Sequence, residues 1–127
     1  MKANVLVDSS VWIEFFAGGP KAKKAAEIIG RAQKSAYKTP SLVLFEVYKK
    51  IKKELSEQKA SEAIAYIIDA TEIIPLNERI AVHAAEISLA HSLSMADSVI
   101  KATAEITGSE IKTKDSHFKG LENVEII

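Results

Sequence analysis

Short apolar segments alternate with longer helical patterns along this 127-residue chain. A short apolar run bounded by polar or turn residues is typical of a buried strand, and apolar residues repeated every three to four positions indicate a helix. Strands that alternate with helices favour an α/β fold, because parallel neighbours must be joined by a crossover element. We therefore predict a three-layer α/β/α sandwich with a mostly parallel central sheet.

The expected elements can be placed along the chain. Buried strands are predicted over residues 4–7, 37–39, 72–76, 110–113 and 124–127. Helices are predicted over residues 9–17, 21–35 and 59–70. Three more are predicted to follow the N-caps Ser41, Asn77 and Ser94 and to end near residues 55, 93 and 108. The sequence has no internal repeat and no long linker, so residues 1–127 are expected to form a single domain.

The overall charge limits the kinds of partner that the chain can bind through bulk attraction. Seventeen basic residues balance seventeen acidic ones, so binding to nucleic acid would need a local patch or a metal ion. The absence of cysteine excludes a disulfide scaffold, a thiolate zinc site and a cysteine nucleophile. The N-terminal segment has neither a secretory pattern nor a membrane-spanning one. A cytoplasmic protein is expected.

Four acidic residues stand where a strand is predicted to end or a helix to begin: Asp8, Glu46, Asp97 and Asp115. In open parallel sheets, ligands bind beyond the carboxyl ends of the strands, so these side chains are expected to converge there. Carboxylates that gather in one place repel each other, and a bound divalent cation offsets the repulsion. The sequence therefore predicts a metal-dependent active site, with phosphodiester hydrolysis as its leading chemistry.

Each acid also has a structural explanation. Asp97 completes a capping-box pattern with Ser94, and Asp8 and Asp115 can cap the segments that follow them. Glu46 is harder to explain in this way, because the residues around it (42–45 and 47) are all apolar. The order and the flanks of the four acids carry more weight than any one of them.

Three stretches of this sequence resemble the PIN-domain family, and within it the VapC-type toxins. VLVDSSVWIE (residues 5–14) looks like the family's first strand, acid and helix, and PSLVLFEVYKKI (residues 40–51) like the helix with the second acid. LSMADSVIKATAEITG (residues 93–108), followed by TKDSHF (residues 113–118), is similar to its most specific stretch. The resemblance implies a Mg²⁺- or Mn²⁺-dependent ribonuclease that hydrolyses RNA.

The resemblance also implies roles for particular residues. Asp8, Glu46, Asp97 and Asp115 match the acidic quartet, as catalytic residues and metal ligands, and Ser9 and Thr113 match hydroxyl positions that support them. The chain departs from many relatives at His117, where a further acid is common, and we assign His117 no catalytic role. His83 and His91 are expected to be surface or helix-packing residues.

Further expectations concern the partners. Lys49, Lys50 and Lys114 are candidates for guiding an RNA strand, although lysines grouped on a helix are more often a solvated face. The resemblance implies an antitoxin that blocks the acidic groove, and a homodimer. Two alternatives stay open: a PIN-like nuclease of RNA processing outside a toxin system, and a non-catalytic α/β binding module. A phospho-receiver module is disfavoured, because only one acid follows the first strand and none follows residues 72–76.

Overall fold

The computed structural model describes residues 4–127, and its elements follow the predicted alternation. The strands are β1 (Asn4–Val7), β2 (Tyr37–Pro40), β3 (Glu72–Ile74), β4 (Ser109–Thr113) and β5 (Val124–Ile126). The helices are α1 (Ser9–Ala17), α2 (Ala22–Ile29), α3 (Ser41–Glu54), α4 (Glu57–Ala70), α5 (Glu78–His91) and α6 (Met95–Thr107), with a 3-10 turn η1 (Ser116–Phe118) before β5.

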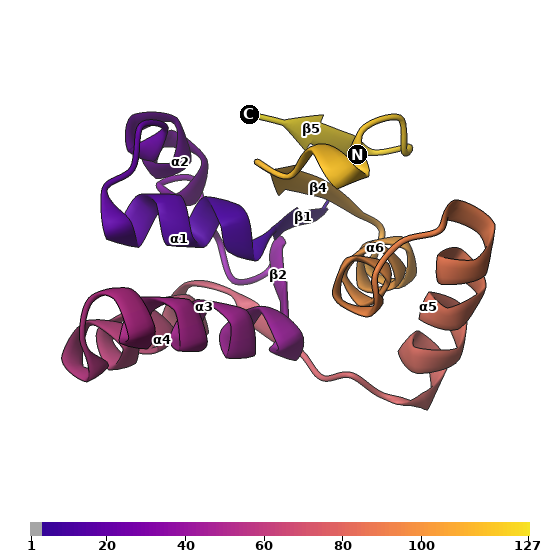
Figure 1. Cartoon of the computed structure of the whole chain (residues 1–127), viewed down its shortest axis with the longest axis horizontal. Coiled ribbons are helices and arrows are strands. Elements are labelled where there is room, and N and C mark those ends of the chain that lie inside the picture. Colours follow the sequence, from indigo (N-terminus) through magenta and orange to yellow (C-terminus); the bar gives the residue numbers. More distant parts are fainter. Residues whose placement is uncertain (1–3) are drawn as a thin grey trace.

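The strands form one sheet in the order β3-β2-β1-β4-β5, and every neighbouring pair is parallel. Figure 1 shows helices α1 to α4 on one side of the sheet and α5 and α6 on the other. The predicted α/β/α sandwich is thus confirmed. The chain first runs outward from β1 to β3 and then continues on the other side of β1 with β4. This reversal between β1 and β4 is the place where sheets of this kind bind their ligands.

Helices α5 and α6 begin where the sequence predicts a capping residue, and α6 also ends where predicted. Asn77 and Ser94 accept hydrogen bonds from the backbone N–H of Ile80 and Asp97, and Gly108 closes α6 with a left-handed φ of 65°. None of the helices between residues 4 and 127 is long and apolar enough to cross a bilayer.

Two predicted helix boundaries are wrong. The helix expected over residues 21–35 ends at Ile29, where Gly30 follows and the next N–H groups bond three residues back. Ser41 is the first residue of α3 rather than its cap, because its hydroxyl accepts a hydrogen bond from the N–H of Leu76, far along the chain. A tertiary contact has therefore replaced the expected local one.

The main core lies between the sheet and the α1–α4 layer, and a smaller cluster lies between α5 and α6. Trp12 is the largest fully buried side chain of the main core, and it stacks on Phe16 at a centroid distance of 6.0 Å. Its complete burial agrees with packing.

We expect Trp12→Ala to lower the free energy of unfolding by about 3–5 kcal/mol, the usual loss for deleting a buried aromatic ring. Phe45→Ala is the matched control, because Phe45 is 59% exposed and its removal leaves no cavity. Urea unfolding at 25 °C measures both variants. Equal losses for the two would contradict the assignment of the core.

Candidate metal centre

Asp8 lies at the carboxyl end of β1 and is almost fully buried. Its Oδ1 accepts a hydrogen bond from the N–H of Ser9 at 2.8 Å, so it caps α1 as the structural alternative required. Its Oδ2 accepts from two hydroxyls, Ser10 Oγ at 2.8 Å and Thr113 Oγ1 at 2.7 Å. Capping uses one oxygen, and the other is fixed in orientation by these hydroxyls.

The same hydroxyls connect Asp8 to the loop after β4. Thr113 Oγ1 accepts a hydrogen bond from the N–H of Asp115 at 2.9 Å, and Ser10 Oγ accepts one from the N–H of Lys114 at 2.9 Å. The fully buried hydroxyl of Thr113 therefore contacts two of the predicted site residues, Asp8 and Asp115, at once. A buried hydroxyl held at both ends fixes the separation of the groups that it joins.

Ser10 is a supporting residue that reasoning from the sequence missed. The motif pointed to Ser9, the hydroxyl residue directly after Asp8, but the hydroxyl of Ser9 instead faces Glu46. There it offsets part of the rise that burial causes in the pKa of the Glu46 carboxyl. Ser10 lies in the first turn of α1, on the side that faces β4. The available signal was the second of two consecutive serines at a helix start, where a side chain can reach back to the preceding acid.

Asp115 caps the 3-10 turn through its Oδ1, which accepts a hydrogen bond from the N–H of His117 at 2.9 Å. The turn is held in place by Phe118, whose side chain is completely buried. The capping explanation thus holds for Asp115 as well, and the carboxylate is fixed near the end of β4 as a consequence.

Glu46 lies in the second turn of α3, and its Oε1 is buried without a hydrogen-bond partner among the described residues. Burial is the main factor that raises the pKa of Glu46, and repulsion from Asp8, Asp97 and Asp115 raises it further. An unsatisfied buried carboxylate oxygen is costly, and a cation would supply the missing interaction. Helix packing alone offers no explanation for a carboxylate in this position.

Asp97 is the third residue of α6, where Ser94 caps the helix. Burial raises the pKa of Asp97, and so does the negative charge of Asp115 and of Asp8. The capping box is realised through the hydroxyl of Ser94, which accepts from the N–H of Asp97 at 3.2 Å. The Asp97 carboxylate lies instead 3.8 Å from the ring of His117.

Glu46 is repelled by the other three acids, and Asp97 by Asp115 and Asp8, although the four residues come from the end of β1, α3, α6 and the loop after β4. Of the four, Asp97 and Asp115 have carboxylate oxygens within 4.8 Å of each other. Their donor set consists of carboxylate oxygens, which suits a hard divalent cation such as Mg²⁺ or Mn²⁺. A cation would offset the repulsion that contributes to the raised pKa of Glu46 and Asp97, and would give Glu46 Oε1 an interaction that it lacks among residues 4–127. The ligand roles of the four residues stay predictions.

The three lysines proposed to guide RNA have different surroundings. Lys114 forms an ion pair with Glu14 at 3.1 Å, and Lys50 pairs with Glu54 in the same helix. The ammonium of Lys49 lies over the ring of Phe45, 5.6 Å from its centroid. Of the three, Lys114 is next to a predicted metal ligand, and its carboxylate partner is nearly buried.

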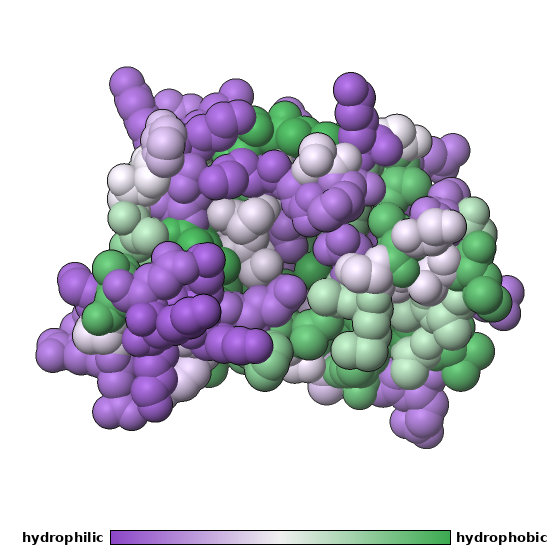
Figure 2. Space-filling view, in the orientation of Figure 1, coloured by the Kyte–Doolittle hydropathy of each residue, from purple (hydrophilic) through white to green (hydrophobic). Residues whose placement is uncertain are grey.

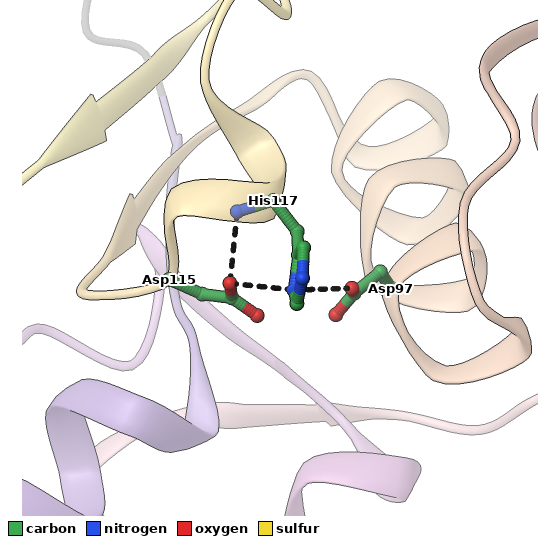
Figure 3. A group of neighbouring side chains, drawn as sticks. All are labelled: Asp97, Asp115 and His117. Carbon is green, nitrogen blue, oxygen red and sulfur yellow. Dashed lines mark hydrogen bonds and ion pairs between the residues drawn. The ribbon is translucent and has the colours of Figure 1, made fainter.

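His117 takes a place at the site that the sequence did not assign to it. Figure 3 shows its ring between the carboxylates of Asp115 and Asp97, with Nδ1 2.9 Å from Asp115 Oδ1. A hollow lined by His91, Ser94, Asp97 and His117 adjoins this group. His83, in contrast, pairs with Glu105 at 2.7 Å between α5 and α6, as a helix-packing residue would.

The comparison with known families assigns the chain to one of them. A model of the PIN domain matches residues 5–123. The chain belongs to the PIN-domain family. No curated protein matches it in sequence.

Solved structures share the fold over nearly the whole chain. A toxin–antitoxin complex from Klebsiella pneumoniae contains a chain with 26% identity and a TM-score of 0.79, over 96% of each chain. VapC20 of Mycobacterium tuberculosis, a toxin that cleaves the sarcin–ricin loop, has 18% identity and a TM-score of 0.81, over 97% of this PIN domain and 98% of that protein. DNA-bound VapBC from Salmonella typhimurium has 15% identity and a TM-score of 0.75, over 99% and 98%. These likenesses confirm the predicted resemblance to VapC-type toxins.

Thr113→Val tests the hydroxyl that joins Asp8 to Asp115. Valine keeps the shape, so we expect a loss of about 1–3 kcal/mol in unfolding free energy from the lost hydrogen bonds. We also expect MnCl₂ to raise the melting temperature of this variant less than that of the wild type, because the carboxylates are no longer oriented.

Thr39→Val is the matched control. Thr39 is a buried threonine of β2 whose hydroxyl bonds to Thr71 at 2.7 Å and to none of the four acids. It is expected to lose stability with no change in the shift caused by MnCl₂. Identical metal responses in the two variants would count against a supporting role for Thr113.

Glu46→Gln tests the repulsion among the acids. Because the folded pKa of Glu46 is raised, its ionised form destabilises the fold, and stability falls as the pH rises from the unfolded pKa of about 4.3. With chelator at pH 7, the variant should melt at a higher temperature than the wild type, and the difference should shrink as the pH approaches 4. Thermal melting over pH 4–7 measures this.

Glu86→Gln, at an exposed position of α5, controls for the general effect of removing one negative charge. It is expected to leave the melting temperature nearly constant. If Glu46→Gln melts below the wild type at pH 7 in chelator, the carboxylate is stabilising and the proposed repulsion is wrong.

Proposed function

We propose that this PIN domain is a divalent-metal-dependent endoribonuclease, and that residues 1–127 form a single nuclease domain. The observation that carries the proposal is Glu46 Oε1, a buried carboxylate oxygen that has no hydrogen-bond partner among the described residues and is repelled by three further acids. Four carboxylates at the reversal point of a parallel sheet form a ligand site rather than a structural one. Asp8, Asp97 and Asp115 would hold the ion, and Glu46 would complete the set.

A bound Mg²⁺ or Mn²⁺ supplies positive charge that stabilises the phosphate as its charge develops, and makes water easier to deprotonate. The protein contributes the orientation of the carboxylates, through Ser10 and Thr113 at Asp8 and through the capped turn at Asp115. Glu46 would also accept the proton of an attacking water, because a raised pKa makes a carboxylate a better base.

RNA is the proposed substrate. With seventeen charges of each sign, the chain has no bulk attraction for a polyanion, so the metal and nearby lysines must provide it. We propose that Lys114, which precedes Asp115, and Lys49, which has no carboxylate partner among the described residues, contact a phosphate strand. Lys50 pairs with Glu54 and Lys114 with Glu14, so a phosphate would compete with a carboxylate at both of these lysines.

We further propose that the domain is the toxin of a toxin–antitoxin pair and acts in the cytoplasm. The support is the shared fold with chains from toxin–antitoxin complexes, one of them at 26% identity over 96% of this chain. An apolar groove between α3 and α4, lined by Leu44, Phe45, Tyr48 and Ile64, offers a surface for the antitoxin. RNA processing outside a toxin system is the alternative, and an adjacent antitoxin gene would decide against it.

A second copy of the chain is the proposed partner of another apolar face. Val82 and Leu89 on α5 and Met95 at the start of α6 are among the most exposed large apolar residues. Figure 2 shows hydrophobic residues gathered on the side of the molecule where Figure 1 places α5. Exposed apolar patches of this kind mark protein interfaces, so a homodimer through α5 is part of the proposal.

Asp8→Asn and Asp97→Asn test the nuclease. Each removes a ligand charge, and the metal contributes several kcal/mol of transition-state stabilisation, so we expect RNA cleavage to fall at least about a hundredfold. Cleavage of a labelled RNA is measured with MnCl₂, with MgCl₂ and with chelator, and the wild type should be active only with metal.

Asp69→Asn, at an exposed position of α4, is the matched control and should keep full activity. Thermal melting shows that each variant is folded. Equal cleavage by the wild type and the two site variants would mean a contaminating nuclease, and the domain would then be better described as a binding module.

A further inference from the structure

His117 gives the cluster a nitrogen donor that an all-carboxylate site lacks. One oxygen of Asp97, one of Asp115 and one nitrogen of His117 all lie within 4.8 Å of one another. The His117 side chain is 75% exposed, and its ring lies between the two carboxylates (Figure 3).

The distances suit ligands of one ion. Donors at about 2.1 Å from an octahedral ion are separated by about 3 Å when adjacent and about 4.2 Å when opposite. His117 Nδ1 lies 2.9 Å from Asp115 Oδ1 and 3.8 Å from Asp97 Oδ2, so both separations fall within or close to this range. Small side-chain rotations would therefore bring the three donors onto one ion.

The backbone keeps His117 in this place. Its N–H donates to Asp115 Oδ1 at 2.9 Å, and the next residue, Phe118, is anchored in the core. The imidazole is therefore presented by the same capped turn that presents Asp115. A histidine elsewhere on the surface would have no such restraint.

We propose that His117 is a nitrogen ligand of the ion held by Asp97 and Asp115, and that it gives this site a preference for Mn²⁺ over Mg²⁺. Imidazole binds first-row transition ions well, whereas Mg²⁺ prefers oxygen ligands and keeps its water. The inference rests on the proposed metal site but not on the identity of the substrate.

Electron paramagnetic resonance of bound Mn²⁺ tests the ligand directly, because a coordinated imidazole produces a hyperfine coupling to ¹⁴N. We expect this coupling in the wild-type protein and in His83→Asn, the matched control in which the histidine paired with Glu105 is removed. We expect its loss in His117→Asn. The experiment measures coordination and needs no RNA.

Calorimetric titration tests the preference. His117→Asn should bind Mn²⁺ at least about tenfold more weakly, the size of loss that follows removal of a group supporting a metal site, with a smaller change for Mg²⁺. His117→Asp, which offers oxygen instead, should recover ion binding without the ¹⁴N coupling and with a lower ratio of Mn²⁺ to Mg²⁺ affinity.

The outcomes separate the two proposals. If Mn²⁺ binds in a way that depends on Asp8 but shows no ¹⁴N coupling, or keeps the coupling in His117→Asn, the role of His117 is overturned and the carboxylate site stands. If Mn²⁺ fails to bind to the wild-type protein, both proposals are overturned. Coupling and selectivity that are lost together in His117→Asn support the inference.

Discussion

The pairing of β1 with β4 is the constraint on which the candidate site depends. The two strands run parallel in register from Asn4 opposite Ser109 to Val7 opposite Lys112. This register places Asp8 next to Thr113, and a 2.7 Å hydrogen bond joins their side chains. Because a shift of one residue would move Thr113 to the other face of the sheet, the site and the hydrophobic core require the same alignment. The core therefore fixes the geometry of the acids, which repel each other.

Most of the fold could be predicted from the sequence, because strands and helices differ in hydrophobic period and several caps are visible as single residues. The first strand and first helix, and the caps at Asn77 and Ser94, are of this kind. The boundary that failed at Ser41 depends on a distant contact. Ser41 has the composition of an N-cap, but the chain near Leu76 uses its hydroxyl. A local pattern carries no information about such a partner.

The site was partly predictable for a related reason. Asp8 and Asp115 each cap a segment and also lie at the end of a strand, so a local rule marked positions that the fold then brings together. Glu46 stood out in the sequence because the residues around it are apolar. The burial of its Oε1 agrees with that interpretation, because the carboxylate does not lie on an exposed stripe of the helix. The sequence did not assign Ser10 or His117 to the site. Ser10 joins α1 to the loop after β4 through a residue more than a hundred positions away, and His117 reaches the site because α6 brings Asp97 beside it.

A second contact between distant segments, the pair of Glu14 with Lys114, also supports the site. The Glu14 carboxylate, nearly buried in the second turn of α1, accepts hydrogen bonds from the N–H of Lys21 and from Lys114 Nζ. Gly19 is packed so closely on it that an added Cβ would lie 1.9 Å from Glu14 Oε2. The glycine thus leaves space for the carboxylate that holds Lys114, which directly precedes Asp115. Since burying Glu14 without a cation would be costly, the ion pair ties the α1–α2 turn to the loop after β4. Helix α1 therefore supports the site at two points, because Asp8 caps its start and Glu14 in its second turn holds Lys114, the residue before Asp115.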